Sequence, residues 1–183
     1  MTIPPEQATP ATPAGARGAA PSDREERILG IIETTRSKRA KFRDSHITMA
    51  HGAGGKATQS LIEGVLLPAF ASEPLAELGD AGLIAADGLE LALTTDSFVV
   101  KPLRFPGGSI GELAVNGTVN DLAVAGARPL ALSLSLILEE GLSADDLRAE
   151  VEAIAGAARA AGVEVVTGDT KVVERGHAEG MYA

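Results

Sequence analysis

The segment at residues 91–121 constrains the fold most, because it combines a strand end, a glycine loop and a helix in one short stretch. Its apolar run ends in Thr94-Thr95-Asp96, and the helix of small residues after the glycines carries Asp121. Carboxylate oxygens of this kind suit Mg²⁺, which prefers carboxylates, waters and substrate phosphates to closed protein cages. The segment therefore predicts a site for a complex of magnesium and a nucleotide.

An Asp-Gly pair at residues 87–88 lies between two apolar runs, which is the pattern of a β-hairpin. Asp80 precedes the first run and Asp96 follows the second, and antiparallel pairing brings those two ends together. The hairpin therefore predicts that both carboxylates lie at one edge of the sheet, close enough to act with Asp121. The alternative is that each aspartate only caps a local turn, as this residue often does.

The helix predicted over residues 110–125 begins after Ser109, a favourable N-cap. Its side chains Asn116 and Asn120 are four residues apart and therefore share one face. Two amides on a helix of small residues suit the close approach of a ligand. The alternative is that the small residues, Gly117 among them, serve helix–helix packing.

The C-terminal part of the chain continues with a predicted strand at residues 130–138 and a helix between the caps Ser143 and Gly162. The predicted apolar stripe of that helix is Leu147, Val151, Ile154 and Ala158. Another strand at residues 163–166 is expected to end in the sequence Thr167-Gly168-Asp169-Thr170-Lys171.

A strand that ends in Gly168, Asp169 and Lys171 suits a phosphate and its metal ion. Lys171 could neutralise phosphate charge or stabilise an anionic transition state. The alternative is a surface turn with a simple Asp–Lys ion pair. The chain stops at Met181-Tyr182-Ala183, where a strand is expected to begin, so we expect the polypeptide to be incomplete.

A glycine-rich segment at residues 51–56 precedes a predicted amphipathic helix. Backbone amides at the start of a helix can hold an anion. The spacing is not that of a Walker A loop, because Lys56 follows two adjacent glycines and no Ser or Thr comes directly after it. A plain flexible turn is the alternative.

Charge and composition divide the chain near residue 45. Residues 1–45 carry a net charge of +2 and residues 46–183 a net charge of −11. Five of the ten prolines lie in residues 1–21, a low-complexity tail that buries too little apolar surface to fold alone. Residues 22–43 could form a helix, and their basic cluster is either a patch for RNA, membrane or a partner, or a solvated extension. We expect residues 1–45 to be an extension and residues 46–183 the folded domain.

Several classes of protein are excluded by the composition. The chain has no cysteine, which excludes a disulfide scaffold and a cysteine-based zinc site. The acidic domain lacks the basic surface of a nucleic-acid-binding protein. No apolar run approaches the roughly 20 residues of a membrane span, and no secretory signal begins the chain. A cytoplasmic protein that contacts neither membrane nor nucleic acid is therefore expected.

Six motifs in order resemble the HypE family of hydrogenase maturation proteins, the carbamoyl dehydratases, within the superfamily of aminoimidazole ribonucleotide synthetase and selenophosphate synthetase. The resemblance covers about residues 46–183. The motifs occupy residues 51–55, 94–97, 105–108, 120–123, 137–142 and 167–176.

The resemblance implies an α+β, ATP-binding N-terminal domain whose sheet pairs with that of a second copy into a barrel-like dimer. It places magnesium at Asp80, Asp96 and Asp121, and it makes Lys171 the catalytic lysine. The residues expected at the nucleotide are Gly52, Gly54, Gly55, Thr95, Asn116, Asn120, Gly168, Asp169 and Lys171.

The implied reaction is the ATP-dependent dehydration of a carboxamide, held on the sulfur of a C-terminal cysteine, to a thiocyanate. The cyanide would then go to the iron of a nickel–iron hydrogenase, with a carbamoyltransferase and an iron-scaffold protein as partners. This chain has no cysteine and lacks the family's C-terminal domain, so we expect it at most to bind nucleotide and to dimerise. The alternatives are a truncated, non-catalytic nucleotide-binding and dimerisation module, and an ATP-using enzyme of the selenophosphate synthetase or thiamine-phosphate kinase type. No cysteine follows His51, which disfavours a selenophosphate synthetase.

Overall fold

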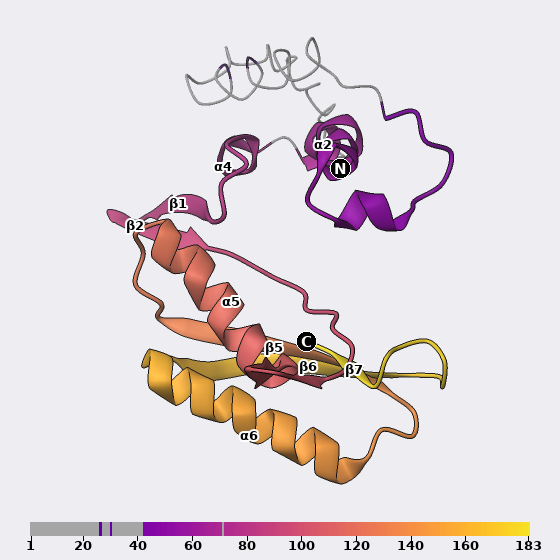
Figure 1. The fold of residues 1–183 in the computed structure, drawn as a ribbon. Coiled ribbons are helices and arrows are strands. Elements are labelled where there is room, and N and C mark those ends of the chain that lie inside the picture. The colour runs from indigo at the N-terminus through magenta and orange to yellow at the C-terminus, as the bar shows by residue number, and fades with distance from the viewer. Residues whose placement is uncertain (1–25, 27–29, 31–41, 71) are drawn as a thin grey trace, which may run out of the picture. The chain divides into compact units, whose positions relative to one another are not determined.

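The computed structural model describes residues 26, 30, 42–70 and 72–183 (Figure 1). The chain divides into two compact units, Met1–Ala71 and Ser72–Ala183. The helix predicted for residues 22–43 and most of its basic cluster lie outside the described residues. Among the residues that the structure does describe, no helix combines the length and the apolar character needed to cross a membrane.

The first unit contains the glycine-rich segment and the helical run after it. A 3₁₀ turn, η1 (Met49–Gly52), leads to α2 (Lys56–Leu61), a π turn η2 (Ile62–Leu66) and α3 (Leu67–Phe70). The predicted helix is therefore present, whereas Gly52 belongs to the 3₁₀ turn and not to an open loop. His51 is buried and fixes this turn, because its Nδ1 accepts a hydrogen bond of 2.9 Å from the Thr48 N–H.

The second unit opens with a short helix and the predicted hairpin. Helix α4 (Glu73–Ala76) precedes β1 (Gly82–Ala86), which pairs antiparallel with β2 (Leu89–Leu93). Asp87 and Gly88 form the turn with φ angles of 50° and 80°. Positive φ at both central residues is the geometry for which Asp-Gly is preferred in two-residue hairpins.

The rest of the second unit is a small sheet with two helices. After β3 (Arg104–Phe105) and β4 (Gly108–Ser109) come α5 (Ile110–Val124), β5 (Ala131–Glu139), α6 (Ala144–Ala161), β6 (Glu164–Val173) and β7 (Met181–Tyr182). The strand order is β6-β5-β7, with β6 parallel and β7 antiparallel to β5. The predicted caps are confirmed, since Ser109 and Ser143 accept hydrogen bonds from the first turns of α5 and α6.

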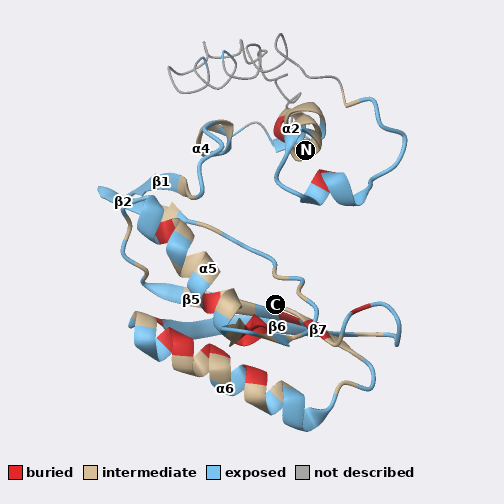
Figure 2. Ribbon diagram, in the orientation of Figure 1, coloured by how far each residue is buried: buried red, intermediate tan, exposed pale blue. Residues whose placement is uncertain are grey.

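The core of this unit lies where α5 and α6 meet β5 (Figure 2). Its buried members are Ile110, Val115, Leu136, Ile154, Ala157, Ala158, Val163 and Met181. Side chains alternate across a strand, so the leucines of β5 pack toward this core. Ser133 and Ser135 are exposed on the opposite side of β5.

Two sequence-based expectations are wrong, and the helix–helix packing considered as the alternative for α5 uses a different glycine. The strand after residue 163 does not end before Lys171, because β6 continues through Gly168 and Asp169 to Val173. On α6, Val151 is 42% exposed, and Glu150 takes the buried position beside it. Helix–helix packing uses Gly111, where an added Cβ would lie 2.4 Å from the Glu150 carbonyl oxygen. Gly117 instead packs against the ring of Phe98.

Candidate functional site

One threonine links two of the aspartates predicted to bind magnesium. The Thr94 hydroxyl, at the end of β2, lies 2.9 Å from the Asp80 carbonyl oxygen and 3.2 Å from Oδ2 of Asp121. This hydroxyl thus ties the start of the hairpin to helix α5. Hairpin pairing opposes Gly82 and Leu93, which brings Asp80 near the residues that follow β2.

Asp96 completes the group of acidic side chains. Partial burial raises the pKa of its carboxyl, and the neighbouring Asp121 raises it further through a hydrogen bond and its negative charge, with a smaller contribution from Asp80. Like charges held near one another disfavour the ionised form of each. A divalent cation at this position would relieve that repulsion.

The three aspartates do not form a ready-made coordination cage. In the described part of the chain, no group of three or more His, Cys, Asp or Glu side chains is placed so that it could hold a metal ion. Mg²⁺ usually keeps several waters and takes only one or two protein carboxylates together with substrate phosphates. The donor set of Asp96 and Asp121, with Asp80 nearby, therefore suits a magnesium ion that arrives with a nucleotide.

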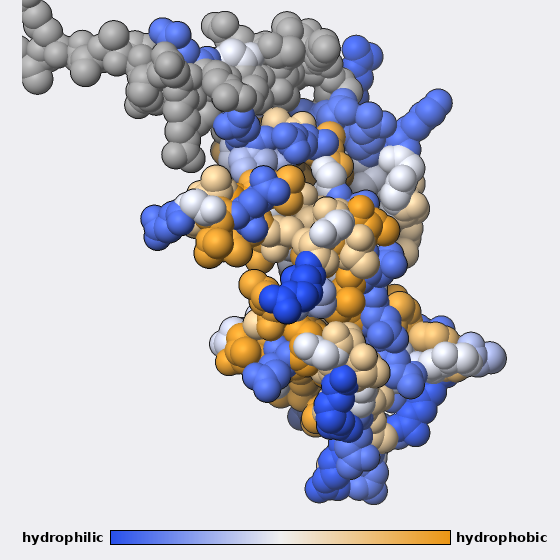
Figure 3. Space-filling model, turned by 90° about the vertical axis from the view of Figure 1, so that its left-hand side faces the viewer, coloured by the Kyte–Doolittle hydropathy of each residue, from blue (hydrophilic) through white to orange (hydrophobic). Residues whose placement is uncertain are grey.

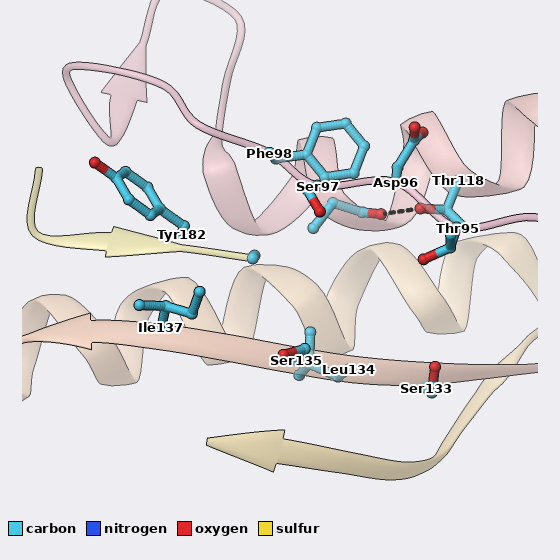
Figure 4. Close-up of a pocket in the computed structure, with 12 residues that line it drawn as sticks. Thr95, Asp96, Ser97, Phe98, Thr118, Ser133, Leu134, Ser135, Ile137 and Tyr182 are labelled. Atoms are coloured by element: carbon cyan, nitrogen blue, oxygen red, sulfur yellow. Dashed lines mark hydrogen bonds between the residues drawn. The ribbon is translucent and has the colours of Figure 1, made fainter. Parts of the chain in front are cut away.

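A pocket of about 180 Å³ lies next to Asp96. Figure 4 shows Thr95, Asp96 and Ser97 on one side and Ser133 and Ser135 of β5 on the other. The remaining lining residues are Phe98, Ala114, Thr118, Leu134, Ile137, Tyr182 and Ala183. The pocket is smaller than the ~300–1,000 Å³ of a usual small-molecule site, so it does not enclose a whole nucleotide.

The amides predicted for nucleotide binding lie on α5 but do not line this pocket. Asn116 and Asn120 are both exposed, on a face of the helix different from that of Thr118. The Thr118 hydroxyl donates back to the Ala114 carbonyl oxygen at 2.9 Å. Thr95, in contrast, lines the pocket as a neighbour of Asp96.

Asp169 and Lys171 form an ion pair on β6. The Lys171 ammonium lies 2.7 Å from Oδ2 of Asp169, and both side chains are exposed. The hydrogen bond from Lys171 lowers the pKa of Asp169, and the N–H of Thr170 adds to that effect. In the parallel pairing of β5 and β6, Asp169 lies opposite Ser135 of β5. The ion pair considered as the alternative thus exists, within a strand and not in a turn.

Gly168 has a packing reason to be glycine. A Cβ at this position would lie 2.2 Å from the Leu134 carbonyl oxygen on β5. The glycines of the first unit are not crowded in this way, since a Cβ at Gly52, Gly54 or Gly55 would meet no atom within 4 Å. Gly54 has a φ of 74° and its N–H donates to the Thr58 hydroxyl at 3.0 Å.

The structural roles of two glutamates were not predicted from the sequence. Glu150 is 1% exposed, and its carboxylate accepts hydrogen bonds from Arg104 Nε at 2.8 Å and from the Gly111 N–H at 3.1 Å. Glu139 accepts from the N–H groups of Gly176 and Gly180 at 2.5 and 2.9 Å and so holds the loop before β7. Glu150 lies three residues after Leu147, a helical spacing that fits the buried stripe as well as Val151 does.

Known protein families and structures include relatives of this chain. The family model "AIR synthase related protein, N-terminal domain" matches residues 78–182, which include α5, α6 and all strands of the second unit. The chain belongs to this family. Over 156 residues it is 47% identical to the carbamoyl dehydratase HypE of Cupriavidus necator, covering 85% of this chain and 44% of that protein. Over 144 residues it is 55% identical to the carbamoyl dehydratase HypE of Rhodobacter capsulatus, covering 77% of this chain and 42% of that protein.

Solved structures give the same match to the N-terminal part of HypE. A HypE–HypF complex matches with a TM-score of 0.62 and 50% identity, over 67% of this chain and 39% of that one. HypE in complex with ATP matches with a TM-score of 0.51 and 48% identity, over 75% of this chain and 41% of that one. The chain thus spans less than half the length of these relatives.

Proposed function

We propose that this chain binds a complex of magnesium and ATP and serves as the nucleotide-binding part of a carbamoyl dehydratase in hydrogenase maturation. The observation that carries the proposal is the geometry at Thr94, whose hydroxyl joins the Asp80 carbonyl oxygen to the Asp121 carboxylate. Partial burial and the neighbouring Asp121 also raise the pKa of Asp96. A surface with a net charge of −11 over residues 46–183 repels a triphosphate unless a cation lies between them. The match to HypE, including the ATP complex, supports ATP as the nucleotide.

Each candidate residue has a role in this proposal. Asp80, Asp96 and Asp121 hold the magnesium ion, which supplies charge neutralisation at the phosphates. Lys171, kept in place by Asp169, stabilises the negative charge that develops on the transferred phosphoryl group. The proposed nucleotide contacts are Thr95, Asn116, Asn120, Gly168 and Asp169, with Gly52, Gly54 and Gly55 of the glycine-rich segment.

The proposed reaction converts an S-bound carboxamide into a thiocyanate. The carboxamide oxygen is a poor leaving group, so it first attacks the γ-phosphorus of ATP and releases ADP. Loss of inorganic phosphate and of both amide protons then leaves a carbon–nitrogen triple bond on sulfur. The sulfur comes from another polypeptide segment, because this chain contains no cysteine.

The partners follow from the same relatives. The HypE–HypF complex supports a carbamoyltransferase as the partner that loads the sulfur. The cyanide group is then passed to iron on a scaffold protein for a nickel–iron hydrogenase. We place all of these steps in the cytoplasm.

A second copy of the chain is the proposed partner of the sheet surface. Large apolar side chains are exposed on several strands, among them Leu93 at 66% and Val166 at 63%. Figure 3 shows apolar atoms exposed between polar ones on one face of the molecule. Exposed apolar side chains can mark an interaction site where they gather. Sheet pairing between two copies into a barrel-like dimer would cover it.

A non-catalytic nucleotide-binding and dimerisation module is the second candidate. The absence of cysteine favours it for this chain on its own, because the thiocyanate chemistry needs a sulfur acceptor. An enzyme of the selenophosphate synthetase type is the third, and the same absence speaks against it.

Calorimetric titration of this chain with ATP tests the proposal. Heat of binding is expected when Mg²⁺ is present and is expected to vanish when EDTA replaces it. AMP, which lacks the β- and γ-phosphates, is the matched control and should bind at least ~10-fold more weakly. Binding of ATP that is equally strong in EDTA would overturn the magnesium-bridged arrangement.

A further inference from the structure

The segment of residues 94–98, which follows β2, is attached to helix α5 at both of its ends. These residues belong to no strand or helix, so contacts with other elements fix their course. At the start, the Thr94 hydroxyl lies 3.2 Å from Oδ2 of Asp121. At the end, the Phe98 ring lies against Gly117, which is four residues before Asp121 and therefore on the same face of α5. The segment thus runs along the helix between two fixed points.

Asp96 lies in the middle of this segment and faces the same helix. Figure 4 shows its carboxylate and the Phe98 ring on the side of the segment away from β5, whereas Thr95 and Ser97 point towards β5. Side chains alternate in this way along an extended chain. The carboxylate comes so near α5 that a Cβ added at Gly117 would lie 3.8 Å from its Oδ2. The carboxylate and the ring therefore share one small area of the helix surface.

Only glycine leaves room for the Phe98 ring at position 117. A Cβ added at Gly117 would lie 2.6 and 2.8 Å from two carbons of the ring, which is closer than packed atoms come. The ring is not free to swing aside, because it packs against the hydrophobic core of this unit. Its backbone is held as well, since the Phe98 N–H donates to the Ala183 carbonyl oxygen at 2.6 Å. A side chain at position 117 would therefore displace the ring together with the residues beside it.

We propose that Phe98 and Gly117 are positioning residues for the magnesium site, because their contact sets where the Asp96 carboxylate lies beside α5. This inference rests on the proposed function, in which Asp96 and Asp121 hold the ion. A phenyl ring and a glycine have no side-chain oxygen to offer a cation, so both act through Asp96. Mg²⁺ demands a near-ideal octahedral arrangement of its ligands, so a displaced carboxylate binds it less well.

The affinity for ATP in saturating Mg²⁺, measured by calorimetry on the whole chain, tests this inference. Gly117→Ala should weaken binding at least ~5-fold, because residues that orient a metal ligand affect metal affinity strongly. The same substitution in a Phe98→Leu chain should cost less than ~2-fold, because leucine lacks the two ring carbons that the new methyl group would meet. Phe98→Leu on its own should weaken binding at least ~3-fold. It adds no clash, so it carries the test if Gly117→Ala does not fold.

Substitution of Asp96 separates a positioning role from a purely structural one. If Phe98 and Gly117 act through the Asp96 carboxylate, Phe98→Leu and Gly117→Ala should each weaken binding by less than ~2-fold in a chain that already carries Asp96→Asn. A purely structural effect would persist in that chain, because it does not depend on the charge at position 96.

Gly111→Ala is the matched control for crowding on α5. A Cβ added at Gly111 would lie 2.4 Å from the Glu150 carbonyl oxygen, so this variant crowds the contact with α6 and not the segment that carries Asp96. It should lower Tm but keep the affinity for ATP within ~2-fold of that of the unchanged chain.

Three results would overturn the positioning role and leave the proposed function standing. They are an unchanged affinity in both Gly117→Ala and Phe98→Leu, an equal loss in Gly111→Ala and Gly117→Ala, and a loss that persists undiminished in the Asp96→Asn chain. If the unchanged chain binds no ATP, or if Asp96→Asn binds it equally well, the proposed function fails and this inference fails with it. The Asp96→Asn chain, measured in the same series, thus tells the two failures apart.

Discussion

At Gly168 the strands β5 and β6 leave no room for a side chain. An added Cβ would lie 2.2 Å from the Leu134 carbonyl oxygen, a contact with backbone that cannot move aside without breaking the ladder. Gly168→Ala should therefore lower the free energy of unfolding by about 2 kcal/mol or more. Chemical denaturation of the purified variant measures this loss.

Gly156 supplies the matched control. It lies within α6, and the nearest atom to an added Cβ is a terminal nitrogen of Arg159 at 3.9 Å. Gly156→Ala should leave stability unchanged or raise it by up to about 1 kcal/mol, since alanine favours the helix. A Gly168→Ala variant as stable as Gly156→Ala would contradict the packing assigned to Gly168.

Replacing Lys171 should slow phosphoryl transfer without lowering the stability of the fold. Its ion pair with Asp169 is exposed, and exposed pairs contribute little to stability. In a chimera with the C-terminal part of the Rhodobacter capsulatus relative, Lys171→Ala should keep its Tm and its affinity for ATP. Its rate of ATP-dependent phosphate release should fall about 10²–10³-fold.

Lys101 is the control for that experiment, because it too is an exposed lysine in an ion pair, with Glu179. Lys101→Ala should release phosphate at the rate of the unchanged chimera. If Lys171→Ala turns over as fast as Lys101→Ala, Lys171 is not a catalytic residue.

Between elements, Glu150 is a buried polar link. Its carboxylate joins α6 to the first turn of α5 through Gly111 and to β3 through Arg104. Removing it leaves Arg104 free to reach water, since that side chain is 56% exposed, but leaves the N–H of Gly111 buried and unpaired. Glu150→Ala should therefore cost about 2–3 kcal/mol. Glu152→Ala, an exposed position on the same helix, should change stability by less than about 0.5 kcal/mol.

The contribution of Glu150 to the stability of the fold should depend on pH. Burial alone would raise the pKa of Glu150, but hydrogen bonds from Arg104, Ser109 and Gly111 outweigh burial and lower it. A carboxyl with a lowered folded-state pKa stabilises the protein above its unfolded-state pKa and loses that stabilisation as pH falls through the folded-state value. The difference in stability between the unchanged chain and Glu150→Ala should thus be full at pH 7 and shrink below about pH 4.3. A difference that grows in acid would contradict this assignment.

The elements that the sequence predicts well are those with local signals. The Asp-Gly turn, the two serine caps and the apolar run of β5 each act within a few residues, and the structure confirms all of them. The length of β6 was missed because Gly168 and Asp169 are typical of loops, and only the contact with Leu134 explains a glycine inside the strand. Glu150 was missed because its partners, Arg104 and Gly111, are far away in the sequence.

At the scale of the whole molecule, hairpin geometry predicted which aspartates approach one another. The structure places Asp80, Asp96 and Asp121 within electrostatic reach, with Thr94 between two of them. The direction of Asn116 and Asn120 could not be predicted, because it depends on how α5 is rotated over β5. Their role at a nucleotide, like that of the three first-unit glycines, stays a prediction.

Measuring self-association tests the proposal that two copies of the chain pair through their exposed apolar side chains. Val166→Glu places a charge on β6 at a position that is 63% exposed, so the fold should be retained. Burying an unpaired charge in a dimer is costly, and dimerisation measured by analytical ultracentrifugation should weaken at least ~10-fold. Val151→Glu, on the exposed side of α6, should dimerise as the unchanged chain does. Equal association of the two variants would place the dimer contact elsewhere.

If Asp96 helps to hold a magnesium ion between the acidic surface and a triphosphate, the affinity for ATP in saturating Mg²⁺ must depend on its charge. Asp96→Asn removes one charge from the cluster, and Asp87→Asn removes one from the exposed hairpin turn, where asparagine tolerates the φ of 50°. Asp96→Asn should lose at least ~10-fold in affinity, or about 1.4 kcal/mol, while Asp87→Asn should bind as the unchanged chain does. Equal affinity of Asp96→Asn and the unchanged chain would contradict this role of Asp96.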